Sequence, residues 1–486
     1  MRFSLILCLL LLALFACGDA AVPIVSGFFP PPESTGAPLV PEQWFEQPLD
    51  HFDGANPRTW KQRYFTSSAH YTKGGPLFVY IGGEGRMSGP SVEGGAWVDY
   101  AKTYKAYLVV VEHRYYGMSR PTEDMSTENL QFLSSEQALA DLANFLTWQR
   151  KQLGGPKIIV FGGSYAGALA AWFRYKYPHI AHGAVASSGP VLAKVDFLEY
   201  MEVVDASLRT YDGRGACNDA ISNATKQIQA MIETKAGRDK LFLLFKLCDH
   251  LNLSISEDIS RLFETLSTPF ASAVQYNTGP PGKSSIDQVC NVMTDSRRGS
   301  YVDRLAAVVM PEPPKSPSQM CLDYKYSKYI KMMRETEWGP SVGVGMRQWI
   351  YQTCTEFGYY QTSDSSHQPF GHGFSLPYFI KQCTDIYGNQ FNKTLVSRDI
   401  VRSNEDYAGL GPKMSRVVFP NGSIDPWHAL GILKDIGPDA KAIFINGTSH
   451  CENMGSPSPN DSPQLKQARA EIRSSIGQWL EADTDY

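Results

Sequence analysis

Residues 162–167, Gly-Gly-Ser-Tyr-Ala-Gly, could place Ser164 as the nucleophile of a hydrolytic reaction. They follow a β-rich run at 157–161 and precede an alanine-rich helical stretch. A sharp turn from strand to helix exposes a serine hydroxyl, and small neighbours let the turn close without a clash. The string departs from the G-x-S-x-G pattern in Ala166, which is still a small residue. We therefore predict a nucleophile elbow in which the N–H of Tyr165 points to a forming oxyanion, rather than an ordinary glycine-rich turn.

A serine hydroxyl is a weak nucleophile without a base, so the chain must also supply a histidine and an acid. In hydrolases with this elbow the acid and then the histidine follow the serine, each after a later strand. Asp425 follows a predicted strand at 416–419, and His450 follows one at 442–445. We predict that Asp425 orients the imidazole of His450, which acts as general base and then as general acid. Three rival residues are expected to have surface roles: Asp435, Asp439 and His428.

Residues 82–85, Gly-Gly-Glu-Gly, follow a predicted strand at 77–81 and could supply the second oxyanion donor. Glycines would let the backbone approach the substrate there, and we nominate the N–H of Gly83 or of Glu84. The alternative is a tight turn with an exposed carboxylate. The string at 112–117, Glu-His-Arg-Tyr-Tyr-Gly, also follows a predicted strand. Its pattern leaves open whether it borders the pocket or braces the elbow.

The elements that must position these residues alternate between β-rich runs and helical patterns up to about residue 190. This alternation is typical of a largely parallel sheet covered by helices on both faces. Residues 134–137, Ser-Ser-Glu-Gln, predict a capping box at the start of a crossover helix, and Ser462 with Pro463 predicts the start of the last helix. The predicted strands are 60–65, 77–81, 107–112, 157–161, 183–187, 416–419 and 442–445.

The middle of the chain has a different character, which predicts a helical domain inserted into the sheet. It carries six of the seven cysteines beyond the leader and helical stretches near 226–245 and 256–266. The predicted fold class is α/β, an α/β-hydrolase fold with an inserted, disulfide-stapled helical cap. The predicted parts are a signal peptide at 1–20, a proline-rich lead-in or propeptide at 21–41, the hydrolase domain at 42–190 and 403–486, and the cap at 191–402.

The N-terminus predicts entry into the secretory pathway, followed by a lysosomal, vesicular or extracellular location. Met1 and Arg2 precede an apolar run at 5–16 and then small residues, which is the order of a cleavable signal peptide. Seven cysteines remain after the leader, and in an oxidising compartment they predict three disulfides and one thiol. Sequons fit the same route. We expect glycosylation at Asn223, Asn252, Asn392 and Asn446, and two further sequons stand at Asn421 and Asn460.

Charge and motifs exclude several other classes of function. The net charge is -4 and no block of Lys or Arg is present, so no nucleic-acid partner is expected. The leader run is too short to span a bilayer and no other apolar stretch is longer, so we expect no membrane span. Neither H-E-x-x-H nor C-x-x-C occurs, so we predict no metal and no cofactor.

Taken together, the strings resemble the peptidase family that contains lysosomal Pro-Xaa carboxypeptidase, dipeptidyl peptidase II and thymus-specific serine peptidase. The match extends from about residue 42 to the C-terminal region, and the longer strings look closest to the thymus-specific branch. The matching strings are Gln-Pro-Leu-Asp-His-Phe at 47–52, those at 82–85, 112–117 and 162–167, Asn-Gly through Asp-Pro-Trp at 421–427, and His450-Cys451.

The resemblance implies a serine triad of Ser164, Asp425 and His450 and cleavage next to proline near a peptide end. It also implies that Trp427 lines the pocket for proline, where a flat indole gives a pyrrolidine ring apolar contact. The family's cap suggests one pairing of the cysteines, with Cys451 left over. These pairs are Cys217–Cys290, Cys248–Cys321 and Cys354–Cys383.

The predicted function is a serine exopeptidase that hydrolyses short proline-containing peptides through an acyl-enzyme. Cap residues decide between a Pro-Xaa carboxypeptidase and an Xaa-Pro dipeptidyl peptidase, and the sequence leaves that choice open. The sequence also leaves open whether two copies of the chain form a homodimer. Two alternative functions are a secreted carboxylesterase or lipase of the same fold, and a catalytically inactive hydrolase-fold binding protein. The family strings and the intact triad favour the peptidase.

Overall fold

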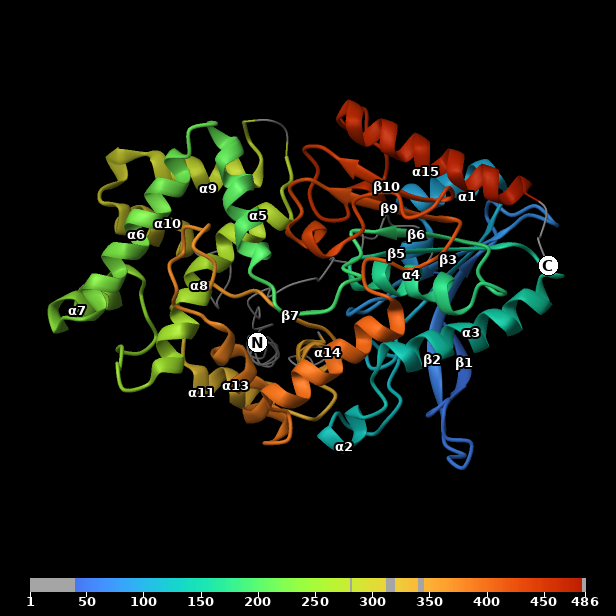
Figure 1. The fold of residues 1–486 in the computed structure, drawn as a ribbon, viewed down its shortest axis with the longest axis horizontal. Coiled ribbons are helices and arrows are strands. Elements are labelled where there is room, and N and C mark those ends of the chain that lie inside the picture. Colours follow the sequence, from blue (N-terminus) through green and yellow to red (C-terminus); the bar gives the residue numbers. More distant parts are fainter. Residues whose placement is uncertain (1–39, 280–281, 312–319, 340–344, 483–486) are drawn as a thin grey trace, which may run out of the picture.

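An eight-stranded sheet forms the centre of the right-hand part of the molecule in Figure 1. The computed structural model describes residues 40–279, 282–311, 320–339 and 345–482. The expected signal peptide and nearly all of the expected lead-in therefore lie outside the described residues. The strands are β1 Gln43–Pro48, β2 Thr59–Ser67, β3 Leu77–Ile81, β4 Tyr107–Val111, β5 Ile158–Gly163, β6 Gly183–Ser187, β9 Val417–Gly422 and β10 Ala440–Ile445.

The strand order is β1-β2-β4-β3-β5-β6-β9-β10. All neighbours from β4 to β10 are parallel, whereas β1 pairs antiparallel with β2, and β2 with β4. Parallel strands of this kind are buried on both faces and read as continuous apolar runs. In β5, Ile159 and Phe161 face one core, whereas Ile158 and Val160 face the other. The predicted α/β-hydrolase fold class is confirmed.

Helices cover both faces of this sheet (Figure 1). α1 (Ala96–Tyr104) and α15 (Pro463–Glu481) pack on one face, where Trp97 and Trp479 are buried. α3 (Ser135–Gln152) and α4 (Tyr165–Lys176) pack on the other. Ser462 caps α15 by accepting a hydrogen bond from the N–H of Leu465, as the sequence predicts. A short helix, α2, spans Thr127–Leu130.

A mainly helical region lies between β6 and β9 and forms the left-hand lobe in Figure 1. It also contains a two-stranded sheet of β7 (Lys194–Asp196) and β8 (Gly358–Tyr360). We call residues 191–402 the cap, although this expected boundary falls inside the last of the helices. The helices are α5 Glu199–Leu208, α6 Ala216–Ile232, α7 Lys235–Leu244, α8 Ser256–Gln275, α9 Ser285–Thr294, α10 Tyr301–Val309, α11 Tyr326–Met333, α12 Met346–Gln352, α13 Leu376–Tyr387 and α14 Lys393–Tyr407.

Three disulfides connect distant segments of the cap. They join the same pairs that the family resemblance implies, and Cys451 is a buried free thiol. One disulfide joins α6 to α9, and another joins the segment after α12 to α13. The disulfides are Cys217–Cys290, Cys248–Cys321 and Cys354–Cys383.

The predicted capping box at the start of α3 is wrong in its second half. The Ser134 side chain accepts a hydrogen bond from the N–H of Gln137, as expected. The Gln137 side chain, however, does not return to Ser134: its Nε2 donates to Asp50 and its Oε1 accepts from the N–H of His51. Tertiary partners from the chain after β1 have replaced the local partner.

Candidate active site

Ser164 lies on a strained turn between β5 and α4. Its backbone angles are φ 59° and ψ -133°, a combination that a residue with a Cβ rarely adopts. The N–H of Ser164 donates to the carbonyl of Ser187 at the end of β6, and its own carbonyl accepts from the N–H of Gly167. These bonds fix the turn in the geometry that exposes a nucleophile at a strand-to-helix junction.

Two glycines of the elbow lie so close to neighbouring backbone atoms that no side chain would fit. A Cβ on Gly162 would stand 1.9 Å from the carbonyl oxygen of Ala166, and one on Gly167 would stand 2.4 Å from that of Ser187. Both distances are far below van der Waals contact. The elbow can therefore form only with glycine at these two positions.

His450 and Asp425 lie side by side beyond the neighbouring strands. Nδ1 of His450 is 2.8 Å from Oδ1 of Asp425, and both side chains are fully buried. The same oxygen accepts a hydrogen bond of 2.9 Å from the N–H of Trp427. Because a carboxylate can only accept, this contact favours the proton on Nδ1 and leaves Nε2 to act as a base.

The loop that carries His450 packs directly on the elbow. A Cβ on Gly163 would meet Sδ of Met454 at 2.4 Å and Sγ of Cys451 at 3.0 Å. The N–H of Cys451 donates to the side chain of Ser188, which follows β6. Since β5, β6, β9 and β10 are parallel neighbours, their C-terminal ends place all three candidate residues at one edge of the sheet.

The surroundings of His450 favour its charged form. Burial on its own lowers the pKa of this imidazole, but the Asp425 carboxylate and Cys451 raise the pKa well above its ordinary value of 6.5. An imidazolium that forms when His450 takes a proton would thus be stabilised at this position. Glu84 also faces this region, and burial raises the pKa of its carboxyl to about 7, partly offset by the charge of His450.

The glycine-rich loop after β3 lies against the start of α4. A Cβ on Gly83 would stand 3.4 Å from the Cβ of Ala166 and 3.6 Å from its backbone nitrogen, so Gly83 borders the elbow. The N-terminus of α4, which begins at Tyr165, directs free N–H groups to the same place. Glu84 is only 5% exposed, so the alternative of a turn with an exposed carboxylate is wrong.

The string at 112–117 braces the elbow. Nε2 of His113 lies 3.0 Å from the hydroxyl of Tyr165, and burial lowers the pKa of His113 to about 4, so its ring is neutral. Arg114 forms a buried ion pair with Asp141 of α3 at 2.6 Å. None of these four side chains lines the pocket described below.

The three rival residues have other contacts. Oδ1 of Asp439 accepts from the indole N–H of Trp479, and Oδ1 of Asp435 accepts from the N–H of Ala442. The ring of His428 packs edge-on against Phe444.

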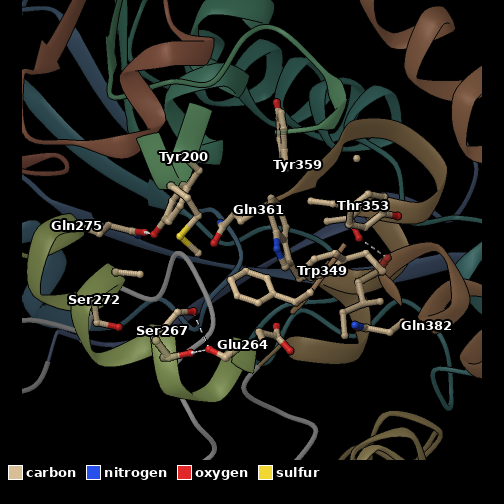
Figure 2. Close-up of a pocket in the computed structure, with 18 of the residues that line it drawn as sticks. Tyr200, Glu264, Ser267, Ser272, Gln275, Trp349, Thr353, Tyr359, Gln361 and Gln382 are labelled. Carbon is tan, nitrogen blue, oxygen red and sulfur yellow. Dashed lines mark hydrogen bonds between the residues drawn. The ribbon is translucent and has the colours of Figure 1, made fainter. Parts of the chain in front are cut away.

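A pocket opens in the cap (Figure 2), and Trp427 of the hydrolase domain completes its lining. Trp427, which is 3% exposed, forms part of its wall. Aromatic rings surround Trp427: the Tyr359 and Tyr200 centroids lie 5.4 and 5.8 Å from its own, and that of His450 lies 6.3 Å away. The indole N–H of Trp427 has no hydrogen-bond partner among the described residues.

Sequence reasoning missed most of this pocket wall. One face of α8 contributes to it over three turns, and α5, α12, β8 and α13 supply further side chains. The α8 residues recur at spacings of three and four, a signal that reads equally as the core face of a helix. They are Glu264, Ser267, Thr268, Ala271, Ser272 and Gln275.

The sequons differ in exposure. Asn252, Asn392 and Asn446 are exposed, and Asn223 is half-buried. Asn421 is buried and its amide donates to the carbonyl of Phe419, so it is not accessible to a glycan. Glycosylation at the four expected positions stays a prediction.

Within the ranges that the structure describes, no helix has the length and apolarity needed to cross a membrane. Those same ranges contain no group of three or more His, Cys, Asp or Glu side chains arranged to hold a metal ion.

The strand order, the elbow after β5 and the helical insertion define an α/β-hydrolase with a serine elbow. Residues 47–472 match the family model described as serine carboxypeptidase S28. The chain belongs to this family, and it is a serine peptidase.

Relatives support the same assignment. The mouse thymus-specific serine protease is 36% identical over 92% of this chain and 89% of its own length. The human lysosomal Pro-X carboxypeptidase is 28% identical over 91% of this chain and 90% of its own length. Among solved structures, a Mycobacterium smegmatis proline iminopeptidase aligns with a TM-score of 0.34 and 13% identity, covering 90% of this chain and 99% of its own.

Proposed function

We propose that this chain is an exopeptidase that cleaves short peptides next to proline through Ser164, His450 and Asp425. The observation that carries the proposal is the buried contact of 2.8 Å between His450 and Asp425, set beside a serine elbow. A lone buried pair of this kind would be an unusual structural feature, whereas it is what a serine nucleophile needs for activation.

In the proposed mechanism, Oγ of Ser164 attacks the scissile carbonyl carbon while Nε2 of His450 takes the hydroxyl proton. Asp425 holds the ring and stabilises the imidazolium. The N–H of Tyr165 and that of Gly83 or Glu84 donate to the oxyanion of the tetrahedral intermediate. His450 then protonates the leaving amine. Water next attacks the acyl-enzyme while His450 takes a proton from it, and His450 returns this proton to Oγ of Ser164 as the acid product leaves.

The preference for proline is proposed from the wall around Trp427. A pyrrolidine ring is apolar and lacks an N–H, so it fits a site made of aromatic faces with few acceptors. Trp427, Tyr200 and Tyr359 provide such faces next to His450. The name of the human relative, lysosomal Pro-X carboxypeptidase, agrees with this preference.

The proposed substrates are short proline-containing peptides, met in a lysosome, a vesicle or the extracellular space. The leader pattern and the lysosomal relative support this location. A homodimer stays a prediction.

The test is the release of products from a blocked peptide, acetyl-Xaa-Pro-Yaa, and from its free-amine counterpart, with Ser164→Ala as the control. We expect Ser164-dependent cleavage next to proline in at least one of the two. Hydrolysis of simple esters without cleavage of either peptide would overturn the proposal and favour a carboxylesterase.

A further inference from the structure

The pocket in the cap contains one charged side chain among its described lining residues, the carboxylate of Glu264. The other described lining residues are apolar, aromatic or neutral and polar, and they include no Lys, Arg or His. Figure 2 shows Glu264 on α8, on the same wall as Ser267, Ser272 and Gln275. A carboxylate accepts hydrogen bonds from an ammonium but not from an ionised carboxylate, and the guanidinium of Arg261, 2.9 Å away, offsets part of its charge.

The protein holds this carboxylate in a fixed orientation. Oε2 of Glu264 accepts from Nη1 of Arg261 at 2.9 Å and from the hydroxyl of Tyr378 at 2.7 Å. Arg261 does not line the pocket, and its guanidinium stacks over the ring of Tyr329 at 4.1 Å. Among the described residues both hydrogen bonds go to Oε2. The second oxygen, Oε1, therefore has no partner there and can accept from a ligand.

Helix α8 connects Glu264 to the catalytic end of the pocket. The carbonyl of Gln275, in the last turn, accepts from the backbone N–H of His450 at 3.0 Å. Glu264 lies three turns earlier on the same face, about 16 Å away at 1.5 Å per residue. An extended peptide covers roughly 3.3–3.6 Å per residue, so a dipeptide spans less than half of this distance and about four to five residues are needed.

We propose that Glu264 binds the N-terminal ammonium of the substrate, and that the acyl segment between this ammonium and the cleaved bond has four to five residues. This inference rests on the proposed function, and it deepens it by assigning the end of the peptide that the pocket accepts. A free C-terminal carboxylate in the same pocket would face Glu264 with a like charge. The pocket thus selects against carboxypeptidase action.

The test uses coumarin amides of the form Ala(n)-Pro, with acyl segments of two to six residues, each with a free and with an acetylated N-terminus. The ratio of kcat/KM for the free peptide to that for the acetylated peptide is measured for the wild type and for Glu264→Gln. We expect a ratio of roughly ten to a hundred for the wild type at four to five residues, which is the usual contribution of a hydrogen bond between charged groups. We expect a ratio near one for Glu264→Gln.

Two variants guard against effects on folding. Glu257→Gln removes a carboxylate from the first turn of the same helix but outside the pocket, and it should leave every ratio unchanged. Glu264→Asp keeps the charge on a shorter side chain, and it should retain a preference for the free amine. Thermal unfolding of each variant reports whether the cap is intact.

The outcomes separate this inference from the proposed function. If the wild type cleaves proline peptides in a Ser164-dependent way but Glu264→Gln has the same ratios at all lengths, the role of Glu264 is overturned and the proposed function stands. A preference for free amines confined to dipeptides would also overturn it. Equal rates for acetylated peptides with an internal Lys and for free-amine peptides would overturn the assignment to the N-terminus. No Ser164-dependent cleavage at any length would overturn the proposed function itself.

Discussion

Two buried carboxyl groups near His450 have different environments. Asp425 contacts the imidazole and accepts a hydrogen bond from a backbone N–H. Glu84 is equally buried, and its pKa is raised to about 7 because burial outweighs the attraction of His450. The site therefore contains, besides the acid that contacts His450, a second carboxyl whose raised pKa favours its protonated form.

The raised pKa of Glu84 leads us to expect that the stability of the protein depends on pH. A carboxyl with a raised pKa in the folded state binds a proton more tightly there than in the unfolded chain, so its contribution to stability is present at low pH. That contribution is lost as the pH rises from about 4.5 to about 7, and it amounts to about 3 kcal/mol for a shift of this size. We expect Glu84→Gln to flatten the decline in the free energy of unfolding between pH 5 and pH 8.

Chemical unfolding of the wild type, Glu84→Gln and the exposed control Glu93→Gln at several pH values checks this. If the free energy of unfolding falls with pH equally in the wild type and in Glu84→Gln, Glu84 is not the group that titrates.

At the scale of elements, the elbow depends on the close approach of β5 to α4. Gly162→Ala would push a methyl group into the Ala166 carbonyl, 1.9 Å from the new carbon, so the turn has to open. We expect at least a hundredfold loss of Ser164-dependent activity together with a destabilisation of a few kcal/mol. Gly54→Ala is the matched control, because nothing lies within 4 Å of its Cβ position.

Peptide turnover and thermal unfolding of both variants measure the two effects. Normal activity in Gly162→Ala would mean that the tight turn is not needed for catalysis.

The local patterns predicted the elements that carry the candidate triad, because strand, turn and helix there are set by neighbouring residues. Strand β1 was missed, since Gln43–Pro48 is an edge strand without an apolar run, and its one buried side chain, Gln47, is polar. The second half of the capping box failed for a related reason: Asp50 and His51, distant in sequence, compete for Gln137. Tertiary contacts decide both cases.

The pocket could not be predicted for the same reason. Its wall combines α8 with α12, β8 and Trp427, and these segments are far apart in the sequence. Nothing in the sequence distinguishes Glu264 from any other helical glutamate. Only the fold places it in a pocket whose described lining holds no other charged side chain, with Arg261 behind it.

At the scale of the whole molecule, the cap encloses the candidate site. Ser164 is 5% exposed and His450 is 3% exposed, and the pocket in the cap is completed by Trp427, whose ring centroid lies 6.3 Å from that of His450. A substrate has to enter as a flexible end, because a folded chain cannot reach the elbow. This arrangement predicts an exopeptidase and not an endopeptidase.

We expect peptides of up to about ten residues to be cleaved near one end, and a folded protein with proline in surface loops to stay intact under the same conditions. Mass spectrometry of the products checks both. Internal cleavage of the folded protein that is lost in Ser164→Ala would contradict the enclosure of the site.

The most direct test of the central claim is labelling with a fluorophosphonate, which reacts with a serine only when a base activates it. The labelled residue is identified by peptide mapping in the wild type, in Ser164→Ala and in His450→Gln. The account predicts a single label on Ser164 that is absent from Ser164→Ala and strongly reduced in His450→Gln. A label on another serine, or undiminished labelling of Ser164 without His450, would contradict it.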